Sequence, residues 1–329
     1  MNQVKKELKT LANKDQRSHG SKDKFSEIWE TSLKTADSRD LQRFTAGHPK
    51  TQMQLVYRRH WLMIKELLQN RMGKCLEVGC GTGAISAYLA NDGYDCTLLD
   101  SSPTAITVAQ SNFGRHDLKG TFVVGDVENL PFESDSFDFI FSIGLMEHFD
   151  DVVSSLQEQI KLIKPGGEFL AIIAPKKRFD ILYYIEHIPT YMKNVPQMPK
   201  SIIRKLKPKS FRKIRTKIRT NLNGDTAGIP GGVFRSTFFN DQYESILMQN
   251  GLSHICSFWI APIPHIQPIP GFLDHLLVLT FEAILLLRRI LFRRNPWIAS
   301  KFLSRGFIIH ASKLLTATDM PKSLKEYKN

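Results

Sequence analysis

The sequence has few cysteines, and they form no pattern that suits a metal site or a disulfide scaffold. Its 329 residues include only Cys75, Cys80, Cys96 and Cys256. Structural zinc sites need closely spaced pairs of ligands, and small secreted domains use cysteine at much higher density. We therefore expect a reducing compartment and predict no metal site.

Long apolar runs of the kind that cross membranes are also missing. No stretch has the length and polarity of a conventional transmembrane span. Residues 1–24 mix lysines with acidic residues and lack the apolar core of a secretory signal. The hydrophobic fraction of 42% and the charged fraction of 23% are those of a globular protein. We expect a cytoplasmic protein whose N-terminal segment is a solvated leader.

Acidic residues are outnumbered, and the excess of positive charge is local. The formal net charge is +13, and residues 200–219 alone contain ten Lys or Arg and no Asp or Glu. Apolar residues lie between these charges. Such a run suits membrane headgroups or nucleic-acid phosphates, whereas a solvated lid without a fixed partner is the alternative.

The sequence does contain a regular alternation of elements between Gly73 and Pro175. Short apolar runs alternate there with stretches of helical spacing, which is typical of βαβ units and a parallel sheet. Helical spacing also predicts a covering helix at 52–68 and a capped helix at 240–249, which Asn250 and Gly251 end. The predicted strands are 74–78, 95–99, 121–124, 137–142, 168–173, 254–260 and 306–311.

The loop after the first predicted strand reads Glu77-Val78-Gly79-Cys80-Gly81-Thr82-Gly83. Such glycines let a ligand approach the backbone closely, but they would also fit a dinucleotide site. Glu77 disfavours a pyrophosphate there and suits the cationic ammonium and sulfonium end of a methionine-like ligand. Asp100, at the end of the second strand, could accept ribose hydroxyls, although NAD enzymes use the same device.

Further landmarks follow in a fixed order. They are Gly125-Asp126-Val127, Leu130-Pro131-Phe132, the Asp135–Asp138 segment and Lys164-Pro165-Gly166-Gly167. Together with the glycine loop, this succession resembles the class I S-adenosylmethionine-dependent methyltransferases, particularly their small-molecule group and, loosely, the ubiquinone-pathway enzymes. The resemblance covers residues 52–175 well and 237–260 and 305–313 loosely. It implies a doubly wound α/β fold with a mostly parallel, seven-stranded sheet, an antiparallel final hairpin and two insertions.

The resemblance also implies S-adenosylmethionine as the cofactor and a role for each landmark. Glu77 would orient the methionine end, which Gly79, Gly81 and Gly83 would line, and Asp100 would bind the ribose. Asp126 and the Val127 backbone would meet the adenine edge, with Ile143 beneath the ring. Each residue could instead serve the fold alone, the glycines as a tight turn and the aspartates as helix caps.

His148 is the candidate general base, because it follows the fourth strand and an acceptor hydroxyl would need a base near the methyl group. The surrounding stretch resembles a loop of ubiquinone-pathway O-methyltransferases in which an E-x-x-E-H pattern is associated with a divalent metal. Here Gly144 replaces the first acidic residue, so we predict no metal. In the alternative, Glu147 and His148 open a helix and pack on the sheet.

The apolar segment 272–292 is flanked by arginines and favours lipid over RNA as a partner. Asp274, His275 and Glu282 interrupt it. This pattern predicts a helix that lies in a membrane interface or roofs a hydrophobic pocket, and a helix buried against the sheet is the alternative.

The sequence therefore predicts a methyltransferase for a small or amphiphilic acceptor, lipid-linked or quinone-like, with peripheral association to an anionic membrane surface. An RNA methyltransferase that uses residues 200–219 and an inactive cofactor-binding scaffold are the alternatives. Nucleic acid is disfavoured as a partner because no RNA-binding module is recognisable. The predicted divisions are 1–50 (leader and helices), 51–175 (cofactor-binding core), 176–236 (basic, aromatic insertion or lid), 237–260 (return to core), 261–304 (apolar helical insertion) and 305–329 (last strand and tail).

Overall fold

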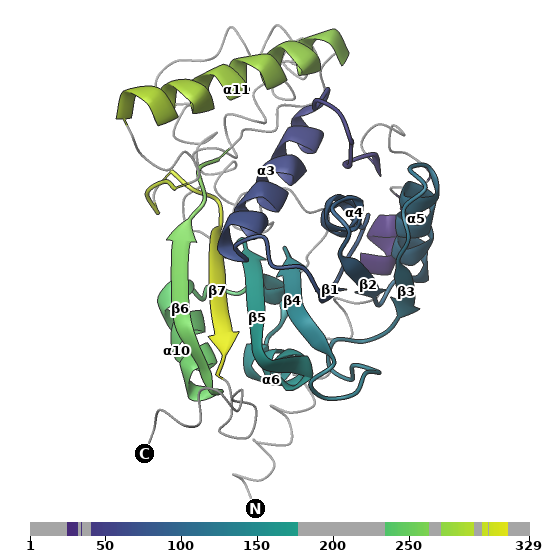
Figure 1. The fold of residues 1–329 in the computed structure, drawn as a ribbon, viewed down its shortest axis with the longest axis vertical. Coiled ribbons are helices and arrows are strands. Elements are labelled where there is room, and N and C mark those ends of the chain that lie inside the picture. Colours follow the sequence, from purple (N-terminus) through teal and green to yellow (C-terminus); the bar gives the residue numbers. More distant parts are fainter. Residues whose placement is uncertain are drawn as a thin grey trace, which may run out of the picture.

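A seven-stranded mixed sheet forms the centre of the molecule (Figure 1). The computed structural model describes residues 25–31, 34, 41–176, 234–262, 271–292, 298–301 and 303–314. The strand order is β3-β2-β1-β4-β5-β7-β6; β1 to β5 pair in parallel, and β7 is antiparallel to both β5 and β6. The strands are β1 Lys74–Val78, β2 Asp95–Asp100, β3 Thr121–Val124, β4 Phe137–Ile143, β5 Ile163–Ile173, β6 Leu252–Trp259 and β7 Phe307–Lys313.

Helices cover both faces of this sheet, and several begin at a side chain that caps free backbone N–H groups. The Ser102 hydroxyl accepts a hydrogen bond from Ala105 N at 3.3 Å, and Pro103 occupies the first turn of α5. Asp151 caps α6 in the same way. The helices are α3 Gln52–Leu67, α4 Ala84–Asn91, α5 Pro103–Gly114, η1 Met146–His148, α6 Val152–Leu162, α10 Asn240–Gln249 and α11 Gly271–Phe292.

The core consists of two apolar layers, one on each face of the sheet. Side chains of α3, α4 and α5 pack on one face, among them Ile64, Ile85 and Phe113. Side chains of α6 and α10, among them Leu156 and Tyr243, pack on the other. The central strands are therefore buried on both faces, which explains why they read as continuous apolar runs in the sequence.

The predicted mixed sheet and its antiparallel hairpin are confirmed, with small differences at strand ends. Strand β5 begins at Ile163 instead of residue 168, because Phe137 pairs with Ile163 across a register shift in the β4–β5 ladder. Strand β6 begins at Leu252, two residues earlier than predicted, and β7 ends at Lys313, two residues later. The basic run at 200–219 and most of the predicted insertion 176–236 lie outside the described residues.

Helix α11 lies against α3 at one end of the molecule (Figure 1). Only a narrow stripe of the helix is covered, centred on Val278, which is fully buried. The alternative, a helix buried against the sheet, is not what the described residues show, because α11 packs on another helix along one stripe. Its exposed side chains include Phe272, Leu273, Leu276, Leu279, Ile284, Leu286, Leu287 and Ile290.

The two carboxylates that interrupt the apolar segment point toward the α3 side of α11. Asp274 accepts hydrogen bonds from the backbone and side-chain nitrogens of Gln52 at 2.9 and 3.0 Å. Glu282 lies 2.7 Å from His48 Nε2.

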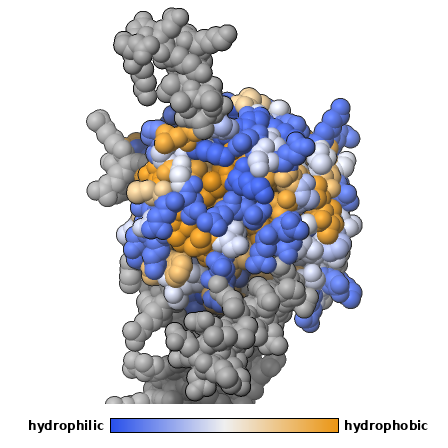
Figure 2. All heavy atoms as spheres, turned by 90° about the horizontal axis from the view of Figure 1, so that it is seen from below, coloured by the Kyte–Doolittle hydropathy of each residue, from blue (hydrophilic) through white to orange (hydrophobic). Residues whose placement is uncertain are grey.

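The end of the molecule opposite α11 shows apolar areas interspersed with hydrophilic residues (Figure 2). Within the described residues no helix has the length and apolar character needed to cross a membrane.

Candidate functional site

Glycines in the left-handed backbone region shape the loop between β1 and α4. The φ angles of Gly79, Gly81 and Gly83 are 71°, 52° and 66°. A Cβ atom added at Gly83 would lie 2.7 Å from Leu98 Cδ2, and one at Gly79 would lie 2.8 Å from Leu145 Cδ1. Both the conformation and the space therefore require glycine. The loop leads directly into a helix N-terminus, so its backbone forms a cradle that a ligand can approach closely.

Glu77 is buried beneath this loop and is bonded to the first turn of α4. Its Oε2 accepts hydrogen bonds from the Ser86 hydroxyl at 2.5 Å and from Ser86 N at 3.2 Å. Burial raises the pKa of Glu77 to about 8, although both bonds from Ser86 oppose this rise. A buried carboxyl group that is costly to ionise without a counter-charge fits a cationic ligand, because the ligand would supply that charge.

Asp100 joins the glycine loop to the end of β2. Its Oδ2 accepts a hydrogen bond from Gly81 N and its Oδ1 one from Ser102 N, each at 2.9 Å. Burial raises the pKa of Asp100, and these backbone N–H groups act in the opposite direction. These two hydrogen bonds give Asp100 a structural role, which is to hold the glycine loop in place. Each carboxylate oxygen has a second lone pair, so the same side chain can also accept hydroxyl groups of a ligand.

The other predicted cofactor residues lie at the same carboxyl edge of the sheet. Asp126 follows β3, and its Oδ1 accepts a hydrogen bond from Glu128 N at 3.0 Å. Val127 is buried against the core, and Ile143 is the last residue of β4. Because β1 to β4 are parallel neighbours, their carboxyl ends bring all the predicted cofactor residues to one edge. In doubly wound sheets this is the edge that binds ligands.

His148 is buried and has one ring nitrogen engaged. Its Nδ1 lies 2.8 Å from the carbonyl oxygen of Phe234, and a carbonyl can only accept, so Nδ1 carries the proton and Nε2 retains a lone pair. Burial lowers the pKa of His148 to about 4. The imidazole is therefore neutral at physiological pH and presents Nε2 as a proton acceptor.

Glu147, which directly precedes His148 in the chain, is a buried acid. Its Oε1 accepts a hydrogen bond from Ala174 N at 3.3 Å and lies 4.0 Å from Arg235 Nη2. Its Oε2 is buried without a hydrogen-bond partner among the described residues. Burial raises the pKa of Glu147 to about 7, against the opposing effect of Arg235. Both residues lie in the short helix η1, and perturbed acids of this kind gather at functional sites.

The predicted division of leader and helices (1–50) includes residues 25–31, but no helix was predicted at these positions and they were given no part in the site. The structure has a helical segment there. In Figure 1 this segment is drawn in purple and is seen between α4 and α5. A Cβ atom at Gly81 would lie 2.9 Å from Trp29 Cζ2, and the Phe25 ring meets the His148 ring edge-on with centroids 4.8 Å apart. The segment thus covers both the glycine loop and the candidate base. The feature of the sequence that could have located this helix is the helical spacing of Phe25, Ile28 and Trp29 in an otherwise polar stretch.

No arrangement of metal ligands accompanies these residues. Among the residues that the structure describes, no group of three or more His, Cys, Asp or Glu side chains is placed to hold a metal ion. Gly144, which stands where the metal-associated pattern has an acid, has a φ of 67°. Its backbone N–H donates to the Ile172 carbonyl at 2.8 Å. The role of Gly144 here is therefore a backbone turn after β4.

Comparison with known proteins identifies the part of the chain that holds this site. Residues 76–171 match the Methyltransf_11 family, described as a methyltransferase domain. A phthiotriol/phenolphthiotriol dimycocerosates methyltransferase of Mycobacterium leprae is 38% identical over 102 residues, which cover 30% of this chain and 37% of that protein. A ubiquinone biosynthesis O-methyltransferase of Coxiella burnetii is 36% identical over 93 residues, with coverage of 28% and 40%. Less than half the length of these relatives is therefore matched.

A likeness over nearly the whole chain exists at the level of the fold. The crystal structure of the [4+2]-cyclase SpnF has a TM-score of 0.54 and 14% sequence identity, and the match covers 90% of this chain and 97% of that one. At this identity the likeness shows a shared architecture and carries nothing about chemistry. The family match and the methyltransferase relatives identify residues 76–171, with the glycine loop, Asp100 and Asp126, as a class I S-adenosylmethionine-dependent methyltransferase domain.

Proposed function

We propose that this protein transfers a methyl group from S-adenosylmethionine to a hydroxyl group of an amphiphilic, lipid-like or quinone-like small molecule. The observation that carries the proposal is the assembly of Glu77, the glycine loop and Asp100 at one edge of the matched domain. Both acids are buried, and burial raises their pKa values. Glu77 suits the positive charge of the proposed ligand, and Asp100 suits its hydroxyl groups. A dinucleotide would gain nothing from Glu77, since its pyrophosphate is anionic.

The cofactor would be held by residues from four strand ends. The glycine loop would take its methionine part, Glu77 would balance its positive charge, and Asp100 would accept the ribose hydroxyls while it keeps its bonds to Gly81 and Ser102. Asp126 and the Val127 backbone would meet the adenine edge, above Ile143. The cofactor supplies a methyl group on a sulfonium, which is already a good leaving group. Most of the acceleration can therefore come from alignment of the acceptor with the methyl group.

His148 would act as the general base. The Phe234 carbonyl fixes the ring so that Nε2 is the free proton acceptor. The lowered pKa keeps the ring unprotonated, although it also makes the ring a weaker base than an exposed histidine. The Phe25 ring packs edge-on against the imidazole and would help to hold it in place.

An amphiphilic acceptor is supported by the surface of α11 and by the relatives. The exposed side of α11 carries leucines and isoleucines together with Arg289, while both acids of the helix are engaged on the α3 side. Such a face suits an anionic lipid surface, from which a lipid-like acceptor can be taken. The two relatives described above are named for a dimycocerosate and for ubiquinone biosynthesis. The predicted insertions 176–236 and 261–304 would select the acceptor.

Transfer of labelled methyl groups tests the proposal. The protein is incubated with methyl-labelled S-adenosylmethionine and, separately, with lipid, polar-metabolite and RNA extracts. We expect label in the lipid extract, and much less when His148→Gln replaces the wild type. Label confined to polar metabolites or RNA would contradict the amphiphilic acceptor. If every extract stays unlabelled although calorimetry shows cofactor binding, the proposed transfer is wrong.

A further inference from the structure

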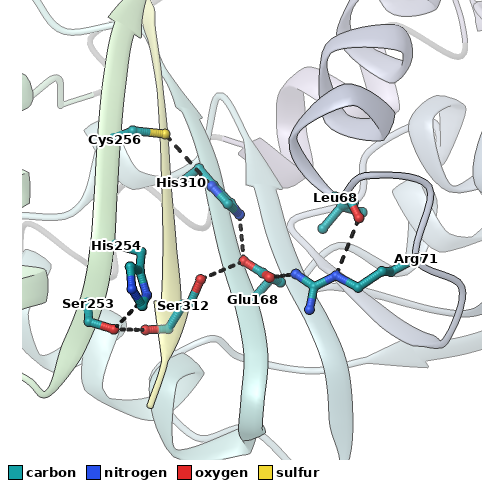
Figure 3. Close-up of polar contacts among 8 residues, drawn as sticks. All are labelled: Leu68, Arg71, Glu168, Ser253, His254, Cys256, His310 and Ser312. Atoms are coloured by element: carbon teal, nitrogen blue, oxygen red, sulfur yellow. Dashed lines mark hydrogen bonds and ion pairs between the residues drawn. The ribbon is translucent and has the colours of Figure 1, made fainter. Parts of the chain in front are cut away.

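A second cluster of reactive side chains lies across strands β5, β7 and β6, away from the cofactor edge. Glu168, His310 and Cys256 stand on neighbouring strands and form a chain of polar contacts (Figure 3). Glu168 pairs in the ladder with Ser312, and Cys256 pairs with His310. Glu168 is also level with Phe139, near the amino end of the parallel strands. Strand β4 lies between β1 and β5, so the cluster on β5, β7 and β6 is displaced across the sheet from the glycine loop after β1.

Glu168 fixes the orientation of His310. The carboxylate is buried, and it accepts hydrogen bonds from His310 Nε2 at 2.6 Å and from the Ser312 hydroxyl at 3.0 Å. Arg71, from the loop after α3, forms an ion pair with its other oxygen. Because three donors surround Glu168, the site accommodates its ionised form, which can only accept. The proton of the imidazole therefore stays on Nε2, and the lone pair of Nδ1 is left for another donor.

Cys256 is placed to be that donor. Its Sγ lies 3.8 Å from His310 Nδ1, within hydrogen-bonding range for sulfur. A register shift in the β6–β7 ladder separates Ser253 from Cys256, and His254 within it has a φ of 48°. Bulges of this kind redirect side chains at sheet edges and beside active sites. The strained backbone brings the thiol opposite the histidine on an exposed edge strand.

Cys256 also differs in exposure from the other cysteines of the chain. It is exposed, whereas Cys75, Cys80 and Cys96 are buried, and all four are free thiols. The group that faces its sulfur is His310 on β7. Glu168 on β5 lies behind His310, Arg71 lies beyond Glu168, and His254 on β6 contacts Ser253 (Figure 3). The arrangement of nucleophile, base and orienting carboxylate is the one that activates thiols in enzymes.

We propose that Cys256 is a reactive thiol that undergoes exchange with small-molecule disulfides. His310 Nδ1 takes the Sγ proton, and the thiolate attacks one sulfur of the incoming disulfide. The S–S bond of the reagent breaks, a mixed disulfide forms on Cys256, and the second half of the reagent leaves as a thiolate that receives the proton from His310. Cys256 is oxidised and the reagent is reduced, so electrons and protons balance.

Reaction of the native protein with 5,5′-dithiobis(2-nitrobenzoate), an aromatic disulfide, tests this assignment. We expect one thiol to react rapidly and Cys256→Ser to abolish that phase. His310→Gln should slow the phase at least tenfold at pH 7, because glutamine cannot take the thiol proton. Ser253→Ala, on the same strand and outside the contact with Cys256, is the matched control and should leave the rate unchanged. A rate unaltered by His310→Gln would overturn the assignment.

Comparison with a free thiol provides a test that needs no variant. N-acetylcysteine is measured in parallel with the wild-type protein at pH 7. We expect Cys256 to react at least tenfold faster, because His310 takes its proton, whereas a free thiol relies on its small thiolate fraction. A rate equal to that of N-acetylcysteine would show an ordinary exposed cysteine. Neither measurement involves S-adenosylmethionine, so the outcome is independent of the proposed methyl transfer.

Discussion

Asp100 is predicted to hold both the loop and the ligand with one carboxylate. In Asp100→Ala, the hydrogen bonds to the ribose would be lost, and affinity for S-adenosylmethionine should fall by about 1.5–3 kcal/mol, or roughly ten- to a hundredfold. Calorimetry measures the change. Asp95→Asn, at the far exposed end of the same strand, is the control and should bind as the wild type does. Unchanged affinity in folded Asp100→Ala would leave Asp100 with its structural role only.

Glu77 should make the stability of the ligand-free protein depend on pH. Folding raises its pKa from 4.5 to about 8, so its favourable contribution is complete only below pH 4.5 and is lost as the pH rises through 8. Glu77→Gln keeps an acceptor for Ser86 and removes this loss. Urea unfolding should find the variant more stable than the wild type at pH 8, by an amount on the order of a few kcal/mol, and nearly equal at pH 4.5. Parallel stability curves would contradict the buried, costly carboxylate.

His148 should affect turnover and leave cofactor binding unchanged. If Nε2 accepts the acceptor proton, His148→Gln should lower kcat by about a hundredfold or more. Calorimetry on the same variant should give the wild-type affinity for the cofactor. Since the pKa of His148 is about 4, its protonation should not limit the rate between pH 6 and 8. Full activity on the true acceptor would return His148 to a packing role beside Glu147.

At the scale of elements, the helical segment 25–31 is predicted to cover the bound cofactor. Trp29 lies over Gly81, so Trp29→Ala should expose the loop and weaken cofactor binding by about 1–2 kcal/mol, or roughly five- to thirtyfold. Phe25→Ala is the comparison, because Phe25 contacts His148 and should influence turnover more than affinity. Equal cofactor affinity in Trp29→Ala and the wild type would show that the segment covers the loop without contributing to binding.

Most helices and strands of the core could be predicted from local sequence patterns. Parallel strands buried on both faces appear as short apolar runs, and the start of α5 is marked by Ser102 and Pro103. Strand ends were harder to predict, because they depend on pairing: β5 begins early only because Phe137 offers Ile163 a partner. The contact of segment 25–31 with the site was not predicted, because its few apolar residues meet a loop more than fifty positions away in the sequence.

At the scale of the whole molecule, α11 and the basic run are predicted to bring the protein to an anionic membrane surface. In a flotation assay the wild type should bind acidic liposomes and lose part of that binding at high salt, since each Lys or Arg near the surface contributes up to about 1 kcal/mol that salt screens. Replacing the exposed Leu276, Leu279, Leu286 and Leu287 with serine should remove nearly all of it.

A matched control separates the apolar face of α11 from exposed apolar residues in general. Val153 and Met248 are also exposed, but they lie on α6 and α10. Changing both to serine should leave flotation unchanged. A wild-type protein that never floats with acidic liposomes would rule out the membrane role and leave α11 as a cover for a small-molecule acceptor.

The sequence by itself determined the strand order along the chain, the glycine loop and the acids at the strand ends. These features are local, because they depend on hydrophobic period, on backbone angles that glycine tolerates and on spacing within βαβ units. The tertiary structure alone decided that α11 packs along one stripe on α3 and that Ser86 holds Glu77. It also decided that Cys256 meets His310, 54 positions away, and that His310 meets Glu168, 142 positions away. Such contacts arise from strand register and burial, which many distant residues set together.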